Sequence, residues 1–267
     1  LGMGGFVSGP GGLAAKLTGR KLVIHEQNAV PGFTNKLLAK MANQVFEAFP
    51  NTFSKNAKII HTGNPLRKEI AALATRPRSI RESSQRLRIL VLGGSQGALA
   101  INEVIPAVLA GFPKGIRPSV RHQTGERTLE RAQAAYANKG LDSQDDITIA
   151  AFISDMAEAY SWADLVICRS GASTVSEIAA VGLPSILIPY PHHSDQQQTH
   201  NANWLVQAGA AFLLEQNGLT AISLKALVLD LHENRGKLQQ MSDISKSIAI
   251  CDAGEIIARR CLELAHA

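Results

Sequence analysis

The chain has 267 residues, of which 45% are apolar and 18% are charged, a balance typical of a globular protein and not of a disordered or fibrous one. Its net charge of +5 favours anionic partners, but the basic residues are scattered, so we expect no nucleic-acid partner. No apolar run approaches the roughly 20 residues of a membrane span, and the three cysteines match no metal or disulfide spacing.

The chain opens on a glycine-rich stretch, LGMGGFVSGPGG, over residues 1–12. We interpret this stretch as a functional loop, because glycine and proline interrupt regular structure. No strand pattern precedes the loop, and the first residue is leucine instead of methionine. We therefore expect a fragment whose first domain is incomplete.

Short β-branched runs then alternate with helical patterns, which predicts parallel βαβ units. The runs are KLVIH at 21–25 and KIIHTG at 58–63, with helical patterns at 32–49 and 66–73. In the 32–49 pattern, apolar side chains recur at helical spacing and predict a helix that faces the core. Because Lys36 and Lys40 lie between them, a membrane-surface patch is the alternative. We assign residues 1–65 to the first domain.

We assign residues 66–249 to a second domain, which includes a polar, basic linker at 74–87. Six strand candidates with intervening helices follow the linker, at 88–94, 118–125, 146–152, 164–171, 184–190 and 210–215. This alternation predicts a doubly wound, Rossmann-like sheet that binds ligands at the carboxyl ends of its strands. Residues 250–267 are expected to form a helix that returns to the first domain.

The first of these strands ends in a glycine turn, Gly93-Gly94-Ser95-Gln96-Gly97. The turn fits the nucleophile elbow of a serine hydrolase and equally fits a loop that binds phosphate at a helix N-terminus. A hydrolase would need an acid and a histidine at later strand ends, and the available Asp195 and His200 share one loop and helix. That placement is poor for a catalytic triad.

Two further polar loops follow later strands of the same predicted sheet. In RSGASTVSEIAAVGLP, Ser173 or Thr174 would cap a helix whose first turn carries Glu177, a pattern that serves phosphate binding or simple capping. The loop at 192–201 contains His192, His193, Asp195 and His200, but their spacing matches no familiar zinc pattern, so no metal is expected. The three loops should converge on one cleft.

Eight motifs resemble, in order and over the whole chain, the MurG family of peptidoglycan N-acetylglucosaminyltransferases: GGFVSGPGG, HEQNAVPGFTNK, GNPLR, GGSQGA, HQTG, FISDM, RSGASTVSEIAAVGLPSILIP and DQQQTHNA. The resemblance implies an α/β fold of the GT-B type, with two Rossmann-like doubly wound parallel-sheet domains, the first one incomplete here. It also implies an inverting transfer of N-acetylglucosamine from UDP-N-acetylglucosamine to lipid I, the undecaprenyl-pyrophosphoryl-muramyl-pentapeptide, to form lipid II, without cofactor or metal. Such an enzyme serves cell-wall synthesis, cell shape and division from an anionic membrane surface, as a peripheral protein at the cytoplasmic face of the bacterial inner membrane.

The resemblance also assigns roles to individual residues. Arg67 and Ser95 would contact the diphosphate, the Ile153 backbone would meet uracil, and Gln197 and Gln198 would hold the donor sugar. Phosphate and ribose would be surrounded by Ala172, Ser173, Thr174, Val175, Ser176 and Glu177. Asn28 would reach the donor from the first domain, and His25 and Glu26 would face the acceptor as catalytic residues. The family's GGTGGH loop has no counterpart here, so the alternative is a UDP-sugar-binding fragment without catalytic activity.

Overall fold

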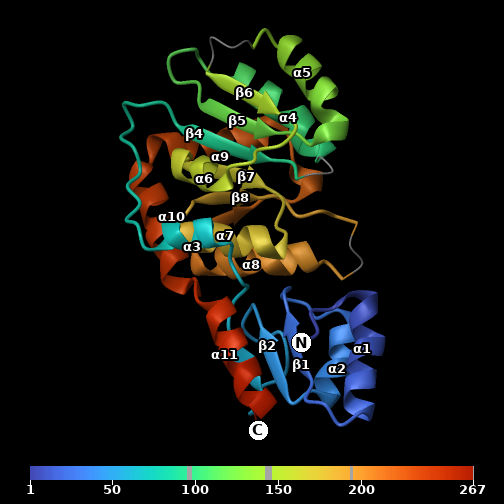
Figure 1. The fold of residues 1–267 in the computed structure, drawn as a ribbon. Coiled ribbons are helices and arrows are strands. Elements are labelled where there is room, and N and C mark those ends of the chain that lie inside the picture. Colours follow the sequence, from blue (N-terminus) through green and yellow to red (C-terminus); the bar gives the residue numbers. More distant parts are fainter. Residues whose placement is uncertain (95–97, 142–145, 193–194, 267) are drawn as a thin grey trace.

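A computed structural model describes residues 1–94, 98–141, 146–192 and 195–266 (Figure 1). The first part of the chain forms a smaller unit, which contains α1 (Gly5–Leu17), β1 (Val23–Glu26), α2 (Phe33–Met41), β2 (Gln44–Glu47) and β3 (Ile59–His61). Its three strands are parallel, in the order β1-β2-β3. Every residue of β1 and β2 is buried, because helices cover both faces of this sheet.

The larger unit begins with α3 (Lys68–Ala74) and carries a six-stranded parallel sheet in the order β6-β5-β4-β7-β8-β9. Its elements are β4 (Arg88–Leu92), α4 (Leu99–Ala110), β5 (Ser119–Gln123), α5 (Leu129–Ala137), β6 (Ile147–Ala150), α6 (Met156–Trp162), β7 (Leu165–Cys168), α7 (Ala172–Val181), β8 (Ser185–Leu187), α8 (Gln197–Ala208), β9 (Ala211–Leu213), α9 (Ala221–Glu233) and α10 (Arg235–Ile248). This strand order is that of the doubly wound Rossmann fold, as predicted.

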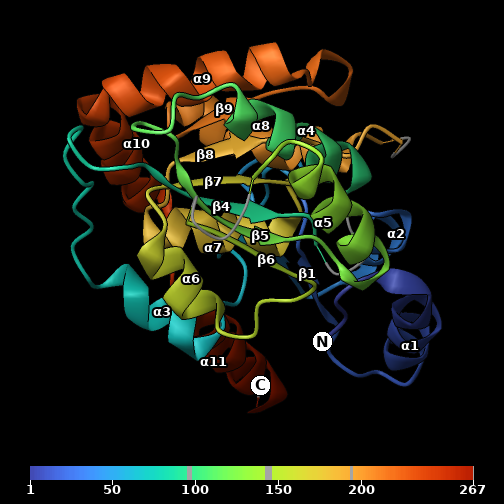
Figure 2. The same cartoon turned by 90° about the horizontal axis from the view of Figure 1, so that it is seen from above.

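Two apolar cores lie on opposite faces of the larger sheet, and β4 shows how the sequence supplies both. Alternate side chains of a strand point to opposite faces. Ile89 and Val91 accordingly join the core formed with α4, α9 and α10, whereas Leu90 and Leu92 join the core formed with α6, α7 and α8. Seen from above, α4 and α9 lie on one side of the sheet, and α3, α6 and α7 on the other (Figure 2).

A last helix, α11 (Ala253–His266), runs back across the smaller sheet (Figure 1). Its residues Ile257, Cys261 and Leu264 pack against Val23 and Phe46. The opposite face of that sheet is covered by α2, whose Leu38 is buried beside β1 and β2. The smaller sheet is therefore covered on one face by a segment that follows the whole larger unit.

Two predictions about the smaller unit are wrong. The stretch expected to be a loop at residues 1–12 contains a helix from Gly5 onward, in which Gly12 lies against α2. A Cβ atom at Gly12 would lie 2.7 Å from Leu38 Cδ2, so this glycine permits close packing of α1 on α2.

The helix expected at 32–49 ends at Met41, and the rest of that pattern includes strand β2. Val45 and Phe46 are both fully buried, on opposite faces of the smaller sheet. A strand that is buried on both faces shows no alternation, so its apolar residues continued the helical spacing by coincidence.

Candidate functional site

The carboxyl ends of the larger sheet's strands border a cavity of about 300 Å³, which we call the sheet-edge cavity. Its lining comes from β4, β5 and β7, from the loop after β6, and from α6, α7 and α8. Five of the predicted substrate-binding residues, far apart in sequence, line it: Arg67, Ile153, Thr174, Glu177 and Gln198. Ser95 lies outside the described residues. The predicted location of the site, at the carboxyl edge of the sheet, agrees with the position of this cavity.

An ion pair between Arg67 and Glu177 forms one wall of the sheet-edge cavity. Arg67 donates from Nε to Glu177 Oε1 at 3.0 Å and from Nη2 to Oε2 at 3.1 Å, a bidentate geometry that favours a strong interaction. The Tyr160 hydroxyl also donates to Glu177 Oε2, at 3.0 Å. Burial, reinforced by the charge of Glu177, raises the pKa of Tyr160 well above its ordinary value, so this hydroxyl remains a neutral donor.

The start of α7 differs from the predicted capping pattern. The helix begins at Ala172 with Gly171 as its N-cap, and no side chain caps it. Capping by Ser173 or Thr174 is therefore wrong, and the Glu177 carboxylate binds Arg67 and Tyr160 instead of a helix end. The backbone N–H groups of the first turn have no acceptor within the helix, which makes this end suitable for an anion.

The predicted residues of the α7 start divide into two groups. Val175 is fully buried in the core and its N–H donates to the Gly171 carbonyl at 2.9 Å, so it supports the helix without facing the cavity. Ser176 donates to the Ala172 carbonyl at 3.0 Å and accepts from Asn64 at 3.0 Å. Of this stretch, the Thr174 side chain lines the cavity.

The Ile153 backbone has a partner that the sequence did not indicate. Its N–H donates to Gln123 Oε1 at 3.1 Å, where Gln123 is the last residue of β5. Next to it, the Phe152 ring is 65% exposed at the cavity wall. Gln123 belongs to the HQTG motif and Phe152 to FISDM, so the motifs contained a signal for both residues, but neither was assigned a role.

A buried polar network supports the glycine turn at the end of β4. His122 bonds through Nδ1 to the Tyr136 hydroxyl at 2.9 Å and through Nε2 to Asn102 Oδ1 at 3.0 Å. Asn102 also donates to the Thr124 carbonyl at 2.9 Å. A Cβ atom at Gly93 would lie 3.1 Å from Asn102 Oδ1, so a glycine lets the turn approach this network closely.

A second cavity of about 670 Å³ lies between the two units, and we call it the interdomain cavity. Glu26, Asn28 and Gln197, all predicted site residues, contribute to its lining. The Glu26 carboxylate is nearly buried and accepts three close bonds, from the Asn28 N–H at 3.0 Å, the Gly32 N–H at 3.1 Å and Asn35 Nδ2 at 2.8 Å. Glu26 therefore fixes the loop that carries Asn28.

His25 lines neither cavity, as the described residues define them. Its ring is fully buried, with Nε2 bonded to the Gly63 carbonyl at 3.0 Å and Nδ1 bonded to Gln27 Nε2 at 3.2 Å. Burial lowers the pKa of His25, which favours a neutral ring that donates to Gly63 and accepts from Gln27. These contacts connect β1 to the loop after β3.

Asn201 in α8 joins the two units beside both cavities. Its fully buried amide accepts the Ala29 N–H at 2.8 Å and donates to Asn28 Oδ1 at 3.2 Å and to the Ser170 carbonyl at 3.3 Å. Near it, Gln197 donates to Asp195 at 2.7 Å. The loop of Asn28 is thereby held against the larger unit, where Gln197 and Gln198 begin α8.

The smaller unit exposes large apolar side chains, and two of them, Phe6 and Phe33, border the interdomain cavity. On α1, Phe6 is 98% and Val7 88% exposed, and on α2, Phe33 is 77% exposed. Lys36 and Lys40 are exposed on α2 as well. Only part of the predicted core face of this helix is buried, at Leu38.

Within the described residues, we find no helix with the length and apolar character needed to cross a membrane. The same residues contain no group of three metal-ligating side chains.

Comparison with known proteins shows similarity over the whole chain. Residues 88–255 match the glycosyltransferase family 28 C-terminal domain and residues 1–47 match the N-terminal domain of the same family. A relative from Shewanella sp. (strain MR-4), named UDP-N-acetylglucosamine--N-acetylmuramyl-(pentapeptide) pyrophosphoryl-undecaprenol N-acetylglucosamine transferase, is 50% identical over 100% of this chain and 72% of its own length. A relative of the same name from Marinobacter nauticus is 47% identical, also over 100% of this chain and 72% of its own length.

Among solved structures, MurG of Acinetobacter baumannii matches 98% of this chain and 73% of its own chain, with a TM-score of 0.84 and 39% identity. A complex of Staphylococcus aureus MnaA with UDP matches 98% of this chain and 75% of its own, with a TM-score of 0.67 and 15% identity. The second match shows a shared fold alone.

Proposed function

Because the chain belongs to glycosyltransferase family 28 and, within it, to the MurG enzymes, we propose that the two cavities hold the two substrates of its transfer reaction. The predicted family, the GT-B-type α/β fold and the glycosyltransferase activity are confirmed. The enzyme transfers N-acetylglucosamine from UDP-N-acetylglucosamine to lipid I, which yields lipid II. A binding fragment without activity is not favoured, since relatives matched over the full chain are named as transferases.

The sheet-edge cavity is the proposed site of UDP. The observation that supports this most directly is the convergence of Arg67, Ile153 and Glu177 from three separate segments on one cavity at the carboxyl edge of the sheet. The Ile153 backbone would pair with the uracil edge, which requires Gln123 to release the N–H that it now accepts. The carboxylate of Glu177 keeps unused lone pairs beside Arg67 and Tyr160 and would accept ribose hydroxyls.

Stabilisation of the leaving diphosphate is the chief chemical task of this cavity. In the proposed reaction the acceptor 4-hydroxyl oxygen attacks the anomeric carbon, the bond from that carbon to UDP breaks, and the hydroxyl proton passes to a base. Negative charge then grows on the diphosphate beside Arg67 and the free N–H groups at the start of α7. Each preorganised donor of this kind can lower the barrier by about 3 kcal/mol.

The interdomain cavity is the proposed site of the donor sugar and the acceptor. Gln197 and Asn28 approach it from opposite units, which suits a sugar held at the junction. Of the two residues predicted to face the acceptor, Glu26 borders this cavity, whereas His25 is buried behind it. We therefore assign Glu26 the role of positioning the Asn28 loop at the acceptor and His25 a supporting role beneath it.

The test of the UDP site uses the isosteric change Glu177→Gln, which keeps the size of the side chain and removes its charge. UDP affinity should fall roughly ten- to hundred-fold in calorimetry, because a hydrogen bond to a charged group is worth about 1.5–3 kcal/mol. Transfer of radiolabelled N-acetylglucosamine to a lipid I analogue should fall with it.

The matched control for this test is Glu215→Gln, which removes a carboxylate of the larger unit outside the sheet-edge cavity. It should bind UDP as the unmodified protein does. Unchanged UDP affinity in Glu177→Gln, with an unchanged fold by circular dichroism, would refute the assignment of UDP to this cavity.

The exposed apolar residues of α1 and α2 are the proposed contact with an anionic membrane surface, at the cytoplasmic face of the bacterial inner membrane. Apolar side chains beside lysines suit the boundary between headgroups and acyl chains. The double change Phe6→Ser and Phe33→Ser should weaken cosedimentation with phosphatidylglycerol vesicles at least about tenfold, since each buried aromatic ring contributes about 1.5–3 kcal/mol. Ile222→Ser, at an exposed apolar position of the larger unit, is the control and should bind vesicles normally.

A further inference from the structure

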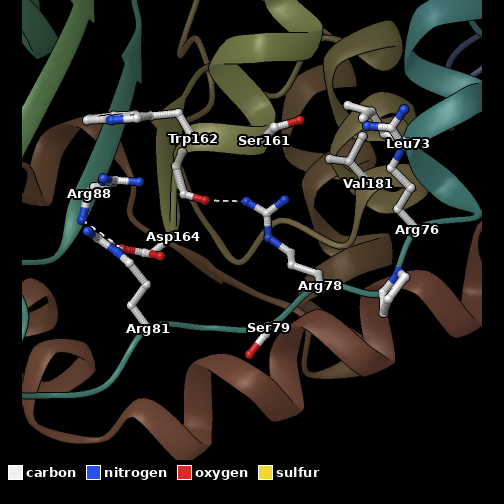
Figure 3. A pocket seen from close by; sticks show the side chains of 12 residues that line it. Leu73, Arg76, Arg78, Ser79, Arg81, Arg88, Ser161, Trp162, Asp164 and Val181 are labelled. Atoms are coloured by element: carbon white, nitrogen blue, oxygen red, sulfur yellow. Dashed lines mark hydrogen bonds and ion pairs between the residues drawn. The ribbon is translucent and has the colours of Figure 1, made fainter.

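A third cavity, of about 370 Å³, lies where strands of the larger sheet begin, at the end opposite the sheet-edge cavity (Figure 3). It is bounded by the segment after α3, by Arg88 at the start of β4, and by the end of α6 up to Asp164 before β7. We call it the linker cavity. None of the residues that line it lines the sheet-edge or the interdomain cavity.

Positive charge dominates the lining of the linker cavity. Four arginines (Arg76, Arg78, Arg81 and Arg88) and one acid (Asp164) line it, which leaves three net positive charges. The acid is already engaged, because Asp164 Oδ2 accepts from Arg81 Nε at 3.1 Å and Nη2 at 2.9 Å and from the Arg88 backbone N–H at 2.9 Å.

Two of these arginines have a clear structural task. Arg81 attaches the linker to Asp164, and Arg78 donates from Nη2 to the carbonyls of Tyr160 and Ala163 at the end of α6. In Figure 3 the Arg78 guanidinium points toward the end of α6. Burial lowers the pKa of Arg78 to about 10, because the charged form loses contact with water.

Arg76 and Arg88 do not attach the linker to other elements through their guanidinium groups. Among the described residues, their guanidinium groups form no hydrogen bond or ion pair with an acceptor. The Arg88 guanidinium lies over the Trp162 ring, 5.7 Å from its centre, and Arg121 lies over the same ring at 4.4 Å. The aromatic ring thus orients Arg88 without neutralising it. Both cations remain available at the cavity.

We propose that the linker cavity is a second anion site, which binds a small phosphate-bearing compound between Arg76, Arg78 and Arg88. Guanidinium groups match phosphate oxygens in bidentate geometry, and a bound anion would offset the mutual repulsion of the cations around this cavity. The volume lies at the lower end of the range for small-molecule sites, which suits a diphosphate or a small phosphorylated metabolite.

Calorimetry with inorganic pyrophosphate, in the presence of saturating UDP, tests this proposal. UDP occupies the sheet-edge cavity, so the remaining heat reports a different site. The double change Arg76→Gln and Arg88→Gln should weaken pyrophosphate binding at least about tenfold, because each lost guanidinium removes charge-assisted bonds. Arg259→Gln on α11, an exposed cation that does not line the cavity, should leave binding unchanged. Absence of pyrophosphate binding under saturating UDP, or equal binding in the double variant, overturns the proposal.

Tryptophan fluorescence provides a second measurement that leaves the arginines intact. The chain has two tryptophans, and the change Trp204→Phe leaves Trp162 as the sole reporter. Pyrophosphate should then alter the emission at the concentration that saturates the heat signal, and an unaltered emission overturns the proposal. A competition with phosphatidylglycerol vesicles distinguishes two possible sources of the phosphate. If the vesicles displace pyrophosphate, the ligand of the linker cavity is a lipid headgroup. If they do not, the ligand is a dissolved compound.

Discussion

His122 illustrates how a single buried side chain can make stability depend on pH. Its ring connects the Tyr136 hydroxyl to Asn102 under the glycine turn, and burial lowers its pKa to about 3. The unfolded chain has an ordinary histidine pKa of about 6.5. As the pH falls below that value, His122 binds a proton in the unfolded state but not in the folded state. Its contribution to the free energy of unfolding is therefore fully present above about pH 6.5 and declines toward pH 3.

We predict that His122→Gln, which keeps a donor and an acceptor but does not titrate, reduces this pH dependence. Between pH 7 and pH 5 the unmodified protein should lose about 2 kcal/mol more unfolding free energy than the variant, from linkage at this one site. Urea unfolding at the two pH values measures the difference. Equal losses in the two proteins would show that His122 is protonated or hydrated in the folded state.

At the same scale, the sequence motifs identified residues of the site but not their partners. Arg67 and Glu177 were both predicted to contact the donor, yet their pairing joins segments separated by 110 positions. Likewise, Gln123 accepts from Ile153 only because β5 and β6 are neighbours in the sheet. Contacts of this kind depend on the tertiary arrangement, which residue spacing along one chain does not specify.

Among the elements, α7 ends at a position that only glycine fits well. Gly182 has φ +64° at the helix C-cap, and a Cβ atom there would lie 2.6 Å from Lys246 Cγ. Its carbonyl also accepts from Ser242 at 2.7 Å, which connects α7 to α10. This turn therefore determines how α7, which carries Glu177, meets the rest of the larger unit.

We predict that Gly182→Ala lowers the unfolding free energy by about 1–3 kcal/mol, since the left-handed conformation and the contact with Lys246 are both unfavourable for a side chain. Gly115→Ala serves as the control, because nothing lies within 4 Å of the added Cβ and its φ is not positive. Thermal and urea unfolding of the two variants provide the comparison. If Gly115→Ala lowers the unfolding free energy as much as Gly182→Ala does, the backbone conformation and the Lys246 contact of Gly182 do not explain the loss.

The elements of the larger unit were more predictable than those of the smaller unit. All six strand runs of the larger sheet were identified, because five are mainly apolar and the polar run of β5 lies between Pro118 and Gly125. In the smaller unit, the strand at 44–47 follows α2 after two residues and is buried on both faces. Neither a turn signal nor an alternation separated it from the helix.

At the scale of the whole molecule, Asn201 connects the unit with the proposed UDP site to the unit with the Asn28 loop. Its side chain replaces water for the Ala29 N–H, for Asn28 and for the Ser170 carbonyl at once. A buried amide of this kind is costly to remove, because its partners lose their bonds without regaining water. The junction should therefore matter more for transfer than for nucleotide binding.

We predict that Asn201→Ala leaves the UDP dissociation constant within about twofold but lowers kcat for transfer about tenfold or more, through loss of alignment between donor and acceptor. Gln207→Ala, an exposed position on the same helix, should change neither quantity. Calorimetry and a transfer assay on the same preparations separate the two effects. A parallel loss of UDP affinity would place Asn201 in the nucleotide site instead of at the junction.

The position of α11 has a consequence for synthesis on the ribosome. Domains usually fold as units in the order in which they are translated. Here Ile257, Cys261 and Leu264 cover Val23 and Phe46 of the smaller sheet, and these three residues are translated after every strand of the larger sheet. The unit that leaves the ribosome first is thus completed last, and until α11 emerges its nascent sheet presents an uncovered apolar face that chaperones could bind.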